Sequence, residues 1–224
     1  MTITESPLSL TFHALLADFY GLVVPWLEQN EERYALPLGL CQRLQHSAQA
    51  DQHKPLLVSV SSEAGKPRAS ALRIGAHYLI VQSEPLCEQA LELLAHSLAE
   101  QGIVLPGVTG VSEASDCFAR FWEARTGTQA KLETCQRAYA LRELNPLRQP
   151  AGSMEPAQPR HALLIFAGIN KMIAETASGN QAAWTLQDVS ACIHDGVCYL
   201  WVAGNEVTSM AFFNRPTRRS IAIS

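Results

Sequence analysis

The chain has 224 residues, of which 47% are hydrophobic and 17% are charged, with a formal net charge of -4. This length and composition suit one large or two small globular domains with a buried core. The negative charge and the scattered Lys and Arg residues give no general attraction for nucleic acid, so no such partner is expected. No run approaches about 18 apolar residues, and no basic stretch precedes an apolar one at the start. We therefore expect a cytoplasmic protein with no membrane partner.

The cysteines are spread thinly rather than clustered as in a disulfide scaffold. Six are present: Cys41, Cys87, Cys117, Cys135, Cys192 and Cys198. Most of them lie within apolar segments, where cysteine behaves as a small hydrophobic residue. We expect buried free thiols.

The first part of the chain begins with helical periodicity and then changes to strand alternation. Apolar residues at helical spacing predict helices over 10–29 and 38–48. Alternation then predicts a hairpin over 55–74 with Gly65 at its turn, followed by a third strand over 77–83.

Helical periodicity returns after this third strand. Residues 84–101 are expected to form a helix capped by Ser83, followed by a short strand within 102–110. A helix over 111–127 ends at Gly127, because glycine readily adopts the left-handed conformation of a C-terminal cap. Residues 130–144 alternate in part and predict one bent strand or two short ones.

Four prolines with Gly152 and Ser153 argue against a packed element in the next segment, so 146–160 is predicted to be a linker. Beyond it, the pattern predicts a strand, two helices, a hairpin around Gly204 and Asn205, and a final strand. These elements span 161–166, 169–177, 185–196, 197–215 and 218–224. The resulting fold class is mixed α/β, with a first domain over 1–145 and a second over 161–224.

From the paired helices onward, the predicted elements follow one another in the same order in both halves, which indicates an internal repeat. The hairpin sequence PLLVSVSSEAGKPRASALRI can be laid on VCYLWVAGNEVTSMAFFNR. In that alignment Gly65 falls near Gly204, and the stretch 69–71 falls near 209–211. Because the identity is low, the alignment supports a shared topology and little else.

Two stretches resemble two-domain bacterial proteins of the GNAT superfamily of N-acetyltransferases. They read GIVLPGVTGVSEASDCFARFWEARTG and YLWVAGNEVTSMAFFNRPT. The family core runs strand, two helices, a three-strand meander, a helix, a strand, a helix and final strands. The resemblance implies tandem GNAT-like domains, the first degenerate and the second carrying acetyl-CoA.

In that family, acetyl-CoA is held by the fourth strand and by a glycine-bearing loop that opens the next helix. Such a loop aims free backbone N–H groups at the pyrophosphate. The matching junction of the first domain reads VQSEPLCEQ, which has no glycine and carries Glu84 and Glu88. In the second domain the junction would follow SIAIS, at the last printed residue. We therefore expect a chain cut off before the cofactor loop, with acetyl-CoA not bound by this chain alone.

The resemblance implies site residues in the second domain only. Ala222, Ile223 and Ser224 approach the strand end that contacts the acyl group, although the same residues suit an apolar core strand. Glu206 and Arg215 flank the second hairpin where substrate would lie, although charges at strand ends are commonly just solvated.

Other candidate residues have simpler readings. The side chains of Trp122, Arg125, Trp184 and Trp201 could line a substrate groove, but tryptophan on a helix or strand more often belongs to the core. The spacing Cys192-x-His194-x3-Cys198 has too few ligands for a zinc site, so no metal is expected. The segment LPGVTG is a turn before a helix capped by Ser112. The histidines are scattered and no nucleophile elbow occurs, so hydrolase chemistry has no support.

Two functions of different classes remain open. The first is transfer of an acetyl group from acetyl-CoA to a small-molecule or peptide amine, by a chain expected to be inactive alone because the cofactor loop is missing. The second is a non-catalytic module that binds a small molecule or a partner. An incomplete second sheet would leave an open edge and an uncovered face, which a complementing chain or a second copy could cover.

Overall fold

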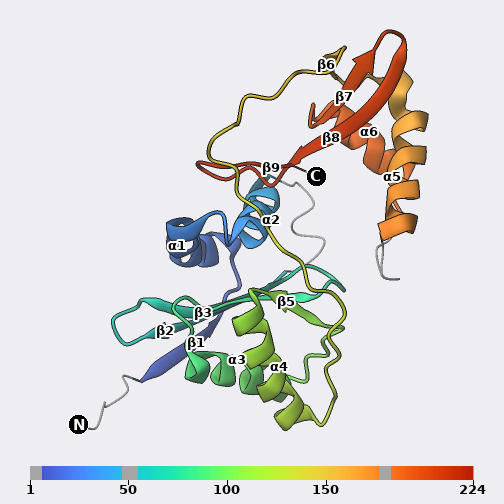
Figure 1. The fold of residues 1–224 in the computed structure, drawn as a ribbon. Coiled ribbons are helices and arrows are strands. Elements are labelled where there is room, and N and C mark those ends of the chain that lie inside the picture. Colours follow the sequence, from blue (N-terminus) through green and yellow to red (C-terminus); the bar gives the residue numbers. More distant parts are fainter. Residues whose placement is uncertain (1–6, 47–54, 177–182, 224) are drawn as a thin grey trace. The chain divides into compact units, whose positions relative to one another are not determined.

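The computed structural model describes residues 7–46, 55–176 and 183–223 (Figure 1). The chain divides into two compact units, which are described separately. Unit 1 comprises Met1–Lys131 and Thr217–Arg219, and unit 2 comprises Leu132–Pro216 and Ser220–Ser224. The fold is mixed α/β, with two sheets and six α-helices among the described residues. Every helix among these residues is too short or too polar to cross a bilayer.

Unit 1 is built on a five-stranded sheet in which the strands follow one another in chain order. The first three pairings are antiparallel and the last, between β4 and β5, is parallel. The strands are β1 (Leu8–Phe12), β2 (Leu56–Ser62), β3 (Pro67–Arg73), β4 (Leu79–Gln82) and β5 (Val108–Gly110).

Helices cover both faces of this sheet (Figure 1). On one face lie α1 (Leu16–Leu27), the short 3-10 turn η1 (Glu28–Asn30) and α2 (Ala35–His46), packed on Leu57 and Leu72. On the other face lie α3 (Glu88–Glu100) and α4 (Ser112–Thr126). Their apolar sides pack on strand residues such as Val58 and Val81. The central strands are therefore buried on both faces, which explains their nearly continuous apolar and small-residue sequences.

The predicted elements of unit 1 hold, with shifts at their starts. Residues 8–12 form β1 rather than the beginning of a helix, because Leu8 and Leu10 alternate into the core while pairing with β2. The helix predicted over 84–101 starts at Glu88, and its N-cap is Cys87 rather than Ser83. Gly65 and Gly127 have positive φ at the expected turn and helix end.

Unit 2 has a four-stranded antiparallel sheet in the order β6-β7-β8-β9. Its strands are β6 (Ser153–Pro156), β7 (Cys198–Ala203), β8 (Glu206–Asn214) and β9 (Ala222–Ile223). Between the first two strands come the 3-10 turn η2 (Pro159–His161), α5 (Ala162–Thr176) and α6 (Leu186–His194). Both helices lie on one face of the sheet, where Ile165, Ile169 and Val189 form a small core with Leu200 and Phe212.

The order of elements in unit 2 repeats that of unit 1. In each unit a strand, two helices and three further strands form an antiparallel meander with the first strand on its edge. Each hairpin also carries a bulge at the same place, with Arg68 and Thr208 as the extra residues of β3 and β8. The bulges align 69–71 with 209–211, the same match that the sequence alignment proposed. A shared bulge is a specific local feature, so it strengthens the inference of a repeat.

Three predictions fail in the region that joins the halves. The expected linker contains β6, whose edge position accommodates its proline and whose entry requires Gly152, because a Cβ there would collide with Val202 O. The stretch 161–166 is helical rather than a strand, since Ile165, Ile169 and Ile173 face the core at helical spacing. Residues 130–144 form neither helix nor strand, and the apolar side chains of Leu132, Tyr139, Leu141 and Leu144 are exposed.

The cysteines are free, and Cys41, Cys87, Cys117 and Cys198 are buried. Cys135 is exposed and Cys192 is intermediate. Burial raises the pKa of the Cys41 thiol to about 12. A protonated, enclosed thiol is a poor nucleophile, so Cys41 is a packing residue.

We predict that Leu94→Ala lowers the free energy of unfolding by about 2–5 kcal/mol. Leu94 is fully buried between α3 and the sheet, so truncation removes burial and leaves a cavity. The matched control is Leu86→Ala, because Leu86 lies just before the same helix and is 44% exposed. We expect this control to cost less than about 1 kcal/mol. Equilibrium urea denaturation measures both, and equal losses would contradict the assigned packing.

Thiol labelling checks the cysteine assignment. With iodoacetamide at pH 8, Cys135 should react first, because it alone among the described cysteines is exposed. Cys41 should stay unmodified until the protein is denatured. Mass spectrometry of tryptic peptides locates the label, and Cys135→Ser should abolish the rapid phase. Rapid labelling of Cys41 in the native protein would contradict its burial.

Candidate functional site

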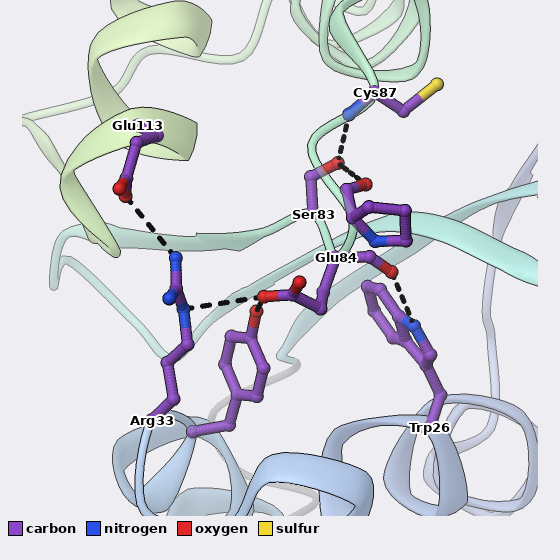
Figure 2. A network of polar contacts seen from close by, with 8 residues as sticks. Trp26, Arg33, Ser83, Glu84, Cys87 and Glu113 are labelled. Carbon is purple, nitrogen blue, oxygen red and sulfur yellow. Dashed lines mark hydrogen bonds and ion pairs between the residues drawn. The ribbon is translucent and has the colours of Figure 1, made fainter.

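The segment that leads from β4 into α3 holds a dense group of polar contacts (Figure 2). Ser83 Oγ accepts a hydrogen bond of 2.9 Å from the backbone N–H of Cys87, which precedes α3. The same hydroxyl is within 2.8 Å of the Arg68 carbonyl, to which it donates. Ser83 therefore ties the start of α3 to the neighbouring strand β3, but the helix cap is Cys87, so the predicted capping role of Ser83 is wrong.

Glu84 is held from three sides. Its carboxylate accepts a hydrogen bond of 2.9 Å from Tyr34 Oη, and Arg33 Nε lies 3.4 Å from the same oxygen. Its backbone carbonyl accepts a bond of 3.1 Å from Trp26 Nε1. All three donors come from α1 or from the turn before α2, so this network joins the helix layer to the strand end (Figure 2).

Further charges surround this junction. Arg33 also reaches Glu113 in the first turn of α4, at 3.4 Å, while Arg120 lies 3.6 Å from Glu88. These three carboxylates and two guanidinium groups form two sets: Glu84 and Glu113 share Arg33, while Glu88 at the start of α3 pairs with Arg120 two turns into α4. Their sum of one net negative charge is unfavourable for a phosphate, although carboxylates at helix starts suit the helix dipoles.

Tyr34 is the most enclosed member of the network, with 2% of its surface exposed. Burial, together with the hydrogen bond to Glu84 and that residue's negative charge, raises the tyrosine pKa well above its usual value. Tyr34 is therefore a neutral hydrogen-bond donor at physiological pH and does not act as a base.

A row of polar residues crosses the sheet on the side of α1 and α2. Ser59, Ser70 and Gln82 are direct cross-strand neighbours on β2, β3 and β4, and all are buried. Ser59 Oγ is 2.8 Å from His13 Nε2, and Ser70 Oγ donates to Gln82 Oε1 at 2.7 Å. Burial lowers the pKa of His13 despite the nearby charge of Asp18.

Gln82 ends this row with an unused donor. Its amide nitrogen is buried and has no hydrogen-bond partner among the described residues. An unsatisfied buried donor costs roughly 1–3 kcal/mol, so such a group often marks a position that a ligand or water completes. Gln82 lies two residues before Glu84, and the two belong to the same strand end.

This arrangement can orient a hydrogen-bonding ligand, but it is poorly suited to hold a pyrophosphate. No glycine lets the backbone approach a phosphate between Ser83 and Cys87, and the carboxylate of Glu84 lies at the junction itself. The Cys87 N–H is already used by Ser83.

The residues that the resemblance singled out in unit 2 do not form one cluster. Ala222 and Ile223 make up β9, opposite Asn214 and Phe213, whereas Ser224 is outside the described residues. Glu206 is exposed at the start of β8. Arg215 follows the other end of β8, where its Nε donates to Asn214 Oδ1 at 3.0 Å. Glu206 and Arg215 thus lie at opposite ends of a nine-residue strand.

Most of the other candidates have structural contacts. Trp122 stacks on Phe118, Arg125 pairs with Glu100 at 3.1 Å, and Trp184 packs against Phe212. Trp201 Nε1 on β7 donates to the Ala151 carbonyl at 3.2 Å.

The cysteine and histidine positions do not form a metal centre in the described part of the chain. Within residues 7–46, 55–176 and 183–223, no three His, Cys, Asp or Glu side chains are placed to share a metal ion. The pKa values of the Cys192 and Cys198 thiols are raised by burial, the latter to about 11. Raised pKa values disfavour the thiolate form that binds metal.

Sequence reasoning found Glu84 but not its partners. Tyr34, Arg33 and Trp26 come from a helix and a turn about 50 residues earlier, and no local pattern marks them as neighbours of β4. A usable signal existed for Gln82, because a large polar side chain in an otherwise apolar strand must be satisfied or functional.

Comparison with known proteins gives no relative from which a function could be transferred. No protein-family model, no curated protein and no solved structure matches the chain.

We predict that Tyr34→Phe lowers the free energy of unfolding by about 1 kcal/mol at pH 7, because it removes one buried hydrogen bond. Tyr139→Phe is the control, since Tyr139 is 88% exposed. The difference in free energy of unfolding between the wild type and Tyr34→Phe should have its full value below pH 10 and become smaller above pH 10. Unfolded tyrosine gives up its proton near 10.0, while folded Tyr34 retains it, so ionisation favours the unfolded wild type. A loss that stays constant through pH 11 in urea titrations would contradict this pairing.

Proposed function

We propose that this chain is a GNAT-type protein, of the class that transfers an acetyl group from acetyl-CoA to an amine, and that unit 1 is its non-catalytic domain. The supporting observation is the sequence of elements in unit 1. A strand, two helices, a three-strand meander, a helix, a parallel strand and a helix follow one another around one sheet. This is the order that the GNAT resemblance implies.

The β4–α3 junction supports a non-catalytic role for unit 1. In the family, the glycine-bearing loop at this place presents bare amides to the pyrophosphate, whereas here Ser83 and Glu84 fill it with internal contacts. The chain departs from the family in a second respect, because residues 130–144, which follow α4, form no final strands to complete the sheet of unit 1. Both departures suit a domain that keeps the scaffold and has lost the cofactor.

Unit 2 would then carry the acetyl-transfer chemistry. The amine attacks the thioester carbonyl, an amide bond forms, and the CoA thiol leaves with a proton. Ala222 and Ile223 in β9 are the candidates for backbone contact with the acyl group. Glu206 and Arg215 are separate candidates for contact with a small-molecule or peptide amine. Acetyl-CoA is the proposed cofactor, with unit 2 as the domain that would use it.

A non-catalytic binding module is the second candidate function. It is favoured by Gln82, whose buried amide nitrogen has no partner among the described residues and would suit an oxygen acceptor of a small ligand. The two candidates differ in whether acetyl transfer occurs.

A loop graft tests the assignment of unit 1. We predict that the β4–α3 junction of the wild type contributes no acetyl-CoA binding, so the wild type sets the calorimetric baseline. The variant Glu84→Gly, Pro85→Gly, Leu86→Gly should bind acetyl-CoA with a Kd of roughly 0.1–1 mM, because backbone amides become free to approach the phosphates. Glu84→Gln removes only the charge and is the matched control, which should stay at the baseline.

The outcomes separate the interpretations. A folded graft whose acetyl-CoA binding does not exceed that of the wild type would count against a GNAT-like junction in unit 1. Acetyl transfer by the full chain to a panel of polyamines and amino acids would support the enzyme. Calorimetric binding of a panel member without acetyl transfer would instead favour the binding module.

A further inference from the structure

Unit 1 includes a short segment from a distant part of the chain. Thr217–Arg219 is grouped with unit 1, whereas the stretches before and after it, Leu132–Pro216 and Ser220–Ser224, are grouped with unit 2. The segment belongs to the connection between β8 and β9 and forms neither helix nor strand. Its hydrogen-bond partners lie 186 to 191 residues earlier in the chain. Contacts over such a distance are not a consequence of local chain geometry.

Glu31 is the centre of these contacts. It lies in the turn that follows η1, and 4% of its surface is exposed. Its Oε2 accepts hydrogen bonds of 2.6 Å from Thr217 Oγ1 and 2.9 Å from the backbone N–H of Arg219. Its Oε1 accepts a third bond, of 3.0 Å, from Arg219 Nε. One carboxylate thus receives a hydroxyl, an amide and a guanidinium from a single three-residue segment.

The guanidinium of Arg219 makes a further contact at the end of α1. Its Nη2 donates to the Glu28 carbonyl at 2.8 Å, and Glu28 is the C-terminal cap of α1. The last carbonyls of a helix have no partner within the helix and lie at the negative end of its dipole, so a cation is favoured there. Arg219 therefore suits both a carboxylate and a helix end.

The segment also lies against the apolar sides of α1 and α2. Thr217 and Arg218 line a small hollow together with Tyr20, Val24 and Leu38, and the last two are 5% and 3% exposed. The volume of this hollow is about 10 Å³, which is room for at most about one water molecule. The segment therefore fits closely against the two helices.

The backbone that leads into the segment is strained. Arg215, the first residue after β8, has a φ of 48°, a left-handed conformation that arginine rarely adopts. Such a conformation persists only where surrounding contacts hold it. The bonds of Thr217 and Arg219 to Glu31 supply an anchor two residues further along the chain.

The burial of Glu31 indicates which ligand it suits. Burial by itself raises the pKa of this carboxyl group, but the hydrogen bonds from Thr217 and Arg219 and the charge of Arg219 lower it more, so the pKa lies below its usual value. Glu31 is therefore ionised at physiological pH. A buried carboxylate is costly unless donors and a positive charge surround it, so this position favours a cationic ligand that also carries a hydroxyl.

We propose that Glu31 and the end of α1 form a peptide-recognition site of unit 1, which binds a Thr-x-Arg segment and is occupied by residues 217–219 of the same chain. The contacts define the order of the ligand. The hydroxyl of its first residue and the guanidinium of its third meet one carboxylate, while Arg218 between them is exposed. This site goes beyond the proposed acetyl transfer and does not depend on it.

Trypsin reports whether the segment is held. Because a proline follows Arg215, trypsin cuts this connection only after Arg218 and Arg219. We expect Glu31→Gln to speed this cleavage in the full chain by about tenfold, since it removes the charge that pairs with Arg219 and so favours the detached segment. Glu28→Gln is the matched control, because Glu28 meets Arg219 through its backbone carbonyl, and its cleavage rate should equal that of the wild type. Equal rates for the wild type and Glu31→Gln would overturn the proposal.

A vacated site tests recognition while every residue of α1 and of the Glu31 turn stays in place. In the full chain, Thr217→Val with Arg219→Ala removes the side chains that bind Glu31. We expect this double variant to bind the peptide NRPTRRSI, the sequence of residues 214–221, with a Kd of roughly 0.1–1 mM, measured by the shift of the Glu31 amide resonance. The wild type should bind it more weakly, because its own segment competes at a high effective concentration.

Two controls make the peptide experiment specific. The peptide NRPRTRSI has the same composition and charge but places threonine directly before arginine, and it should bind the double variant at least about fivefold more weakly. Adding Glu31→Gln to the double variant should weaken binding of NRPTRRSI by a similar factor. Equal binding of the two peptides, or binding that is unchanged by Glu31→Gln, would refute a Thr-x-Arg site at Glu31.

Discussion

The architecture of unit 1 depends on one constraint, the burial of both faces of its central strands. Val58 and Val60 point to α3 and α4, while Leu57 and Leu72 point to α1 and α2, and none of these side chains can be left in water without a large cost. Two helix layers must therefore pack on opposite faces of one sheet. The crossing from β4 to α3 is the place where the chain passes from the sheet to the second layer, and the polar contacts concentrate there.

At this crossing the chain satisfies its own charges and backbone groups. The Ser83 hydroxyl accepts a hydrogen bond from the Cys87 amide just before α3. The Glu84 carboxylate accepts a hydrogen bond from the Tyr34 hydroxyl and pairs with the Arg33 guanidinium. The same geometry that would offer amides to an anion is closed by side chains of the protein. The buried amide of Gln82 is the part of this region that the described residues leave incomplete.

The sheets of the two units differ in how many of their faces are covered by helices. In unit 1 the antiparallel meander is enclosed on both sides, whereas in unit 2 the described helices α5 and α6 cover one side. The residues of the other side differ accordingly, with the aromatic side chains of Tyr199, Trp201 and Phe213 on that side of the sheet.

Local periodicity was enough to predict the hairpins of both units and the helices α3, α4 and α6, because their apolar spacing is set by neighbouring residues. The turns at Gly65 and Gly127 were predictable for the same reason, since their backbone requirements are local. It failed at β1, which has a helix-compatible pattern and becomes a strand only by pairing with β2. It also failed at β6 and the start of α5, where proline content and a short apolar run favoured the wrong states. The alternating pattern of 130–144 found no neighbouring strand to pair with among the described residues.

The sequence by itself determined the mixed α/β class, the repeated order of elements and the glycine-free junction with Glu84, since these depend on residue type and spacing along the chain. Only the tertiary structure decided that Tyr34, Arg33 and Trp26 meet Glu84, that the Gln82 amide is buried without a partner among the described residues, and that α5 and α6 cover one side of the unit 2 sheet. These features join residues that are distant in sequence. Their contacts depend on how the layers pack and on which strands are neighbours, and no local pattern carries that information.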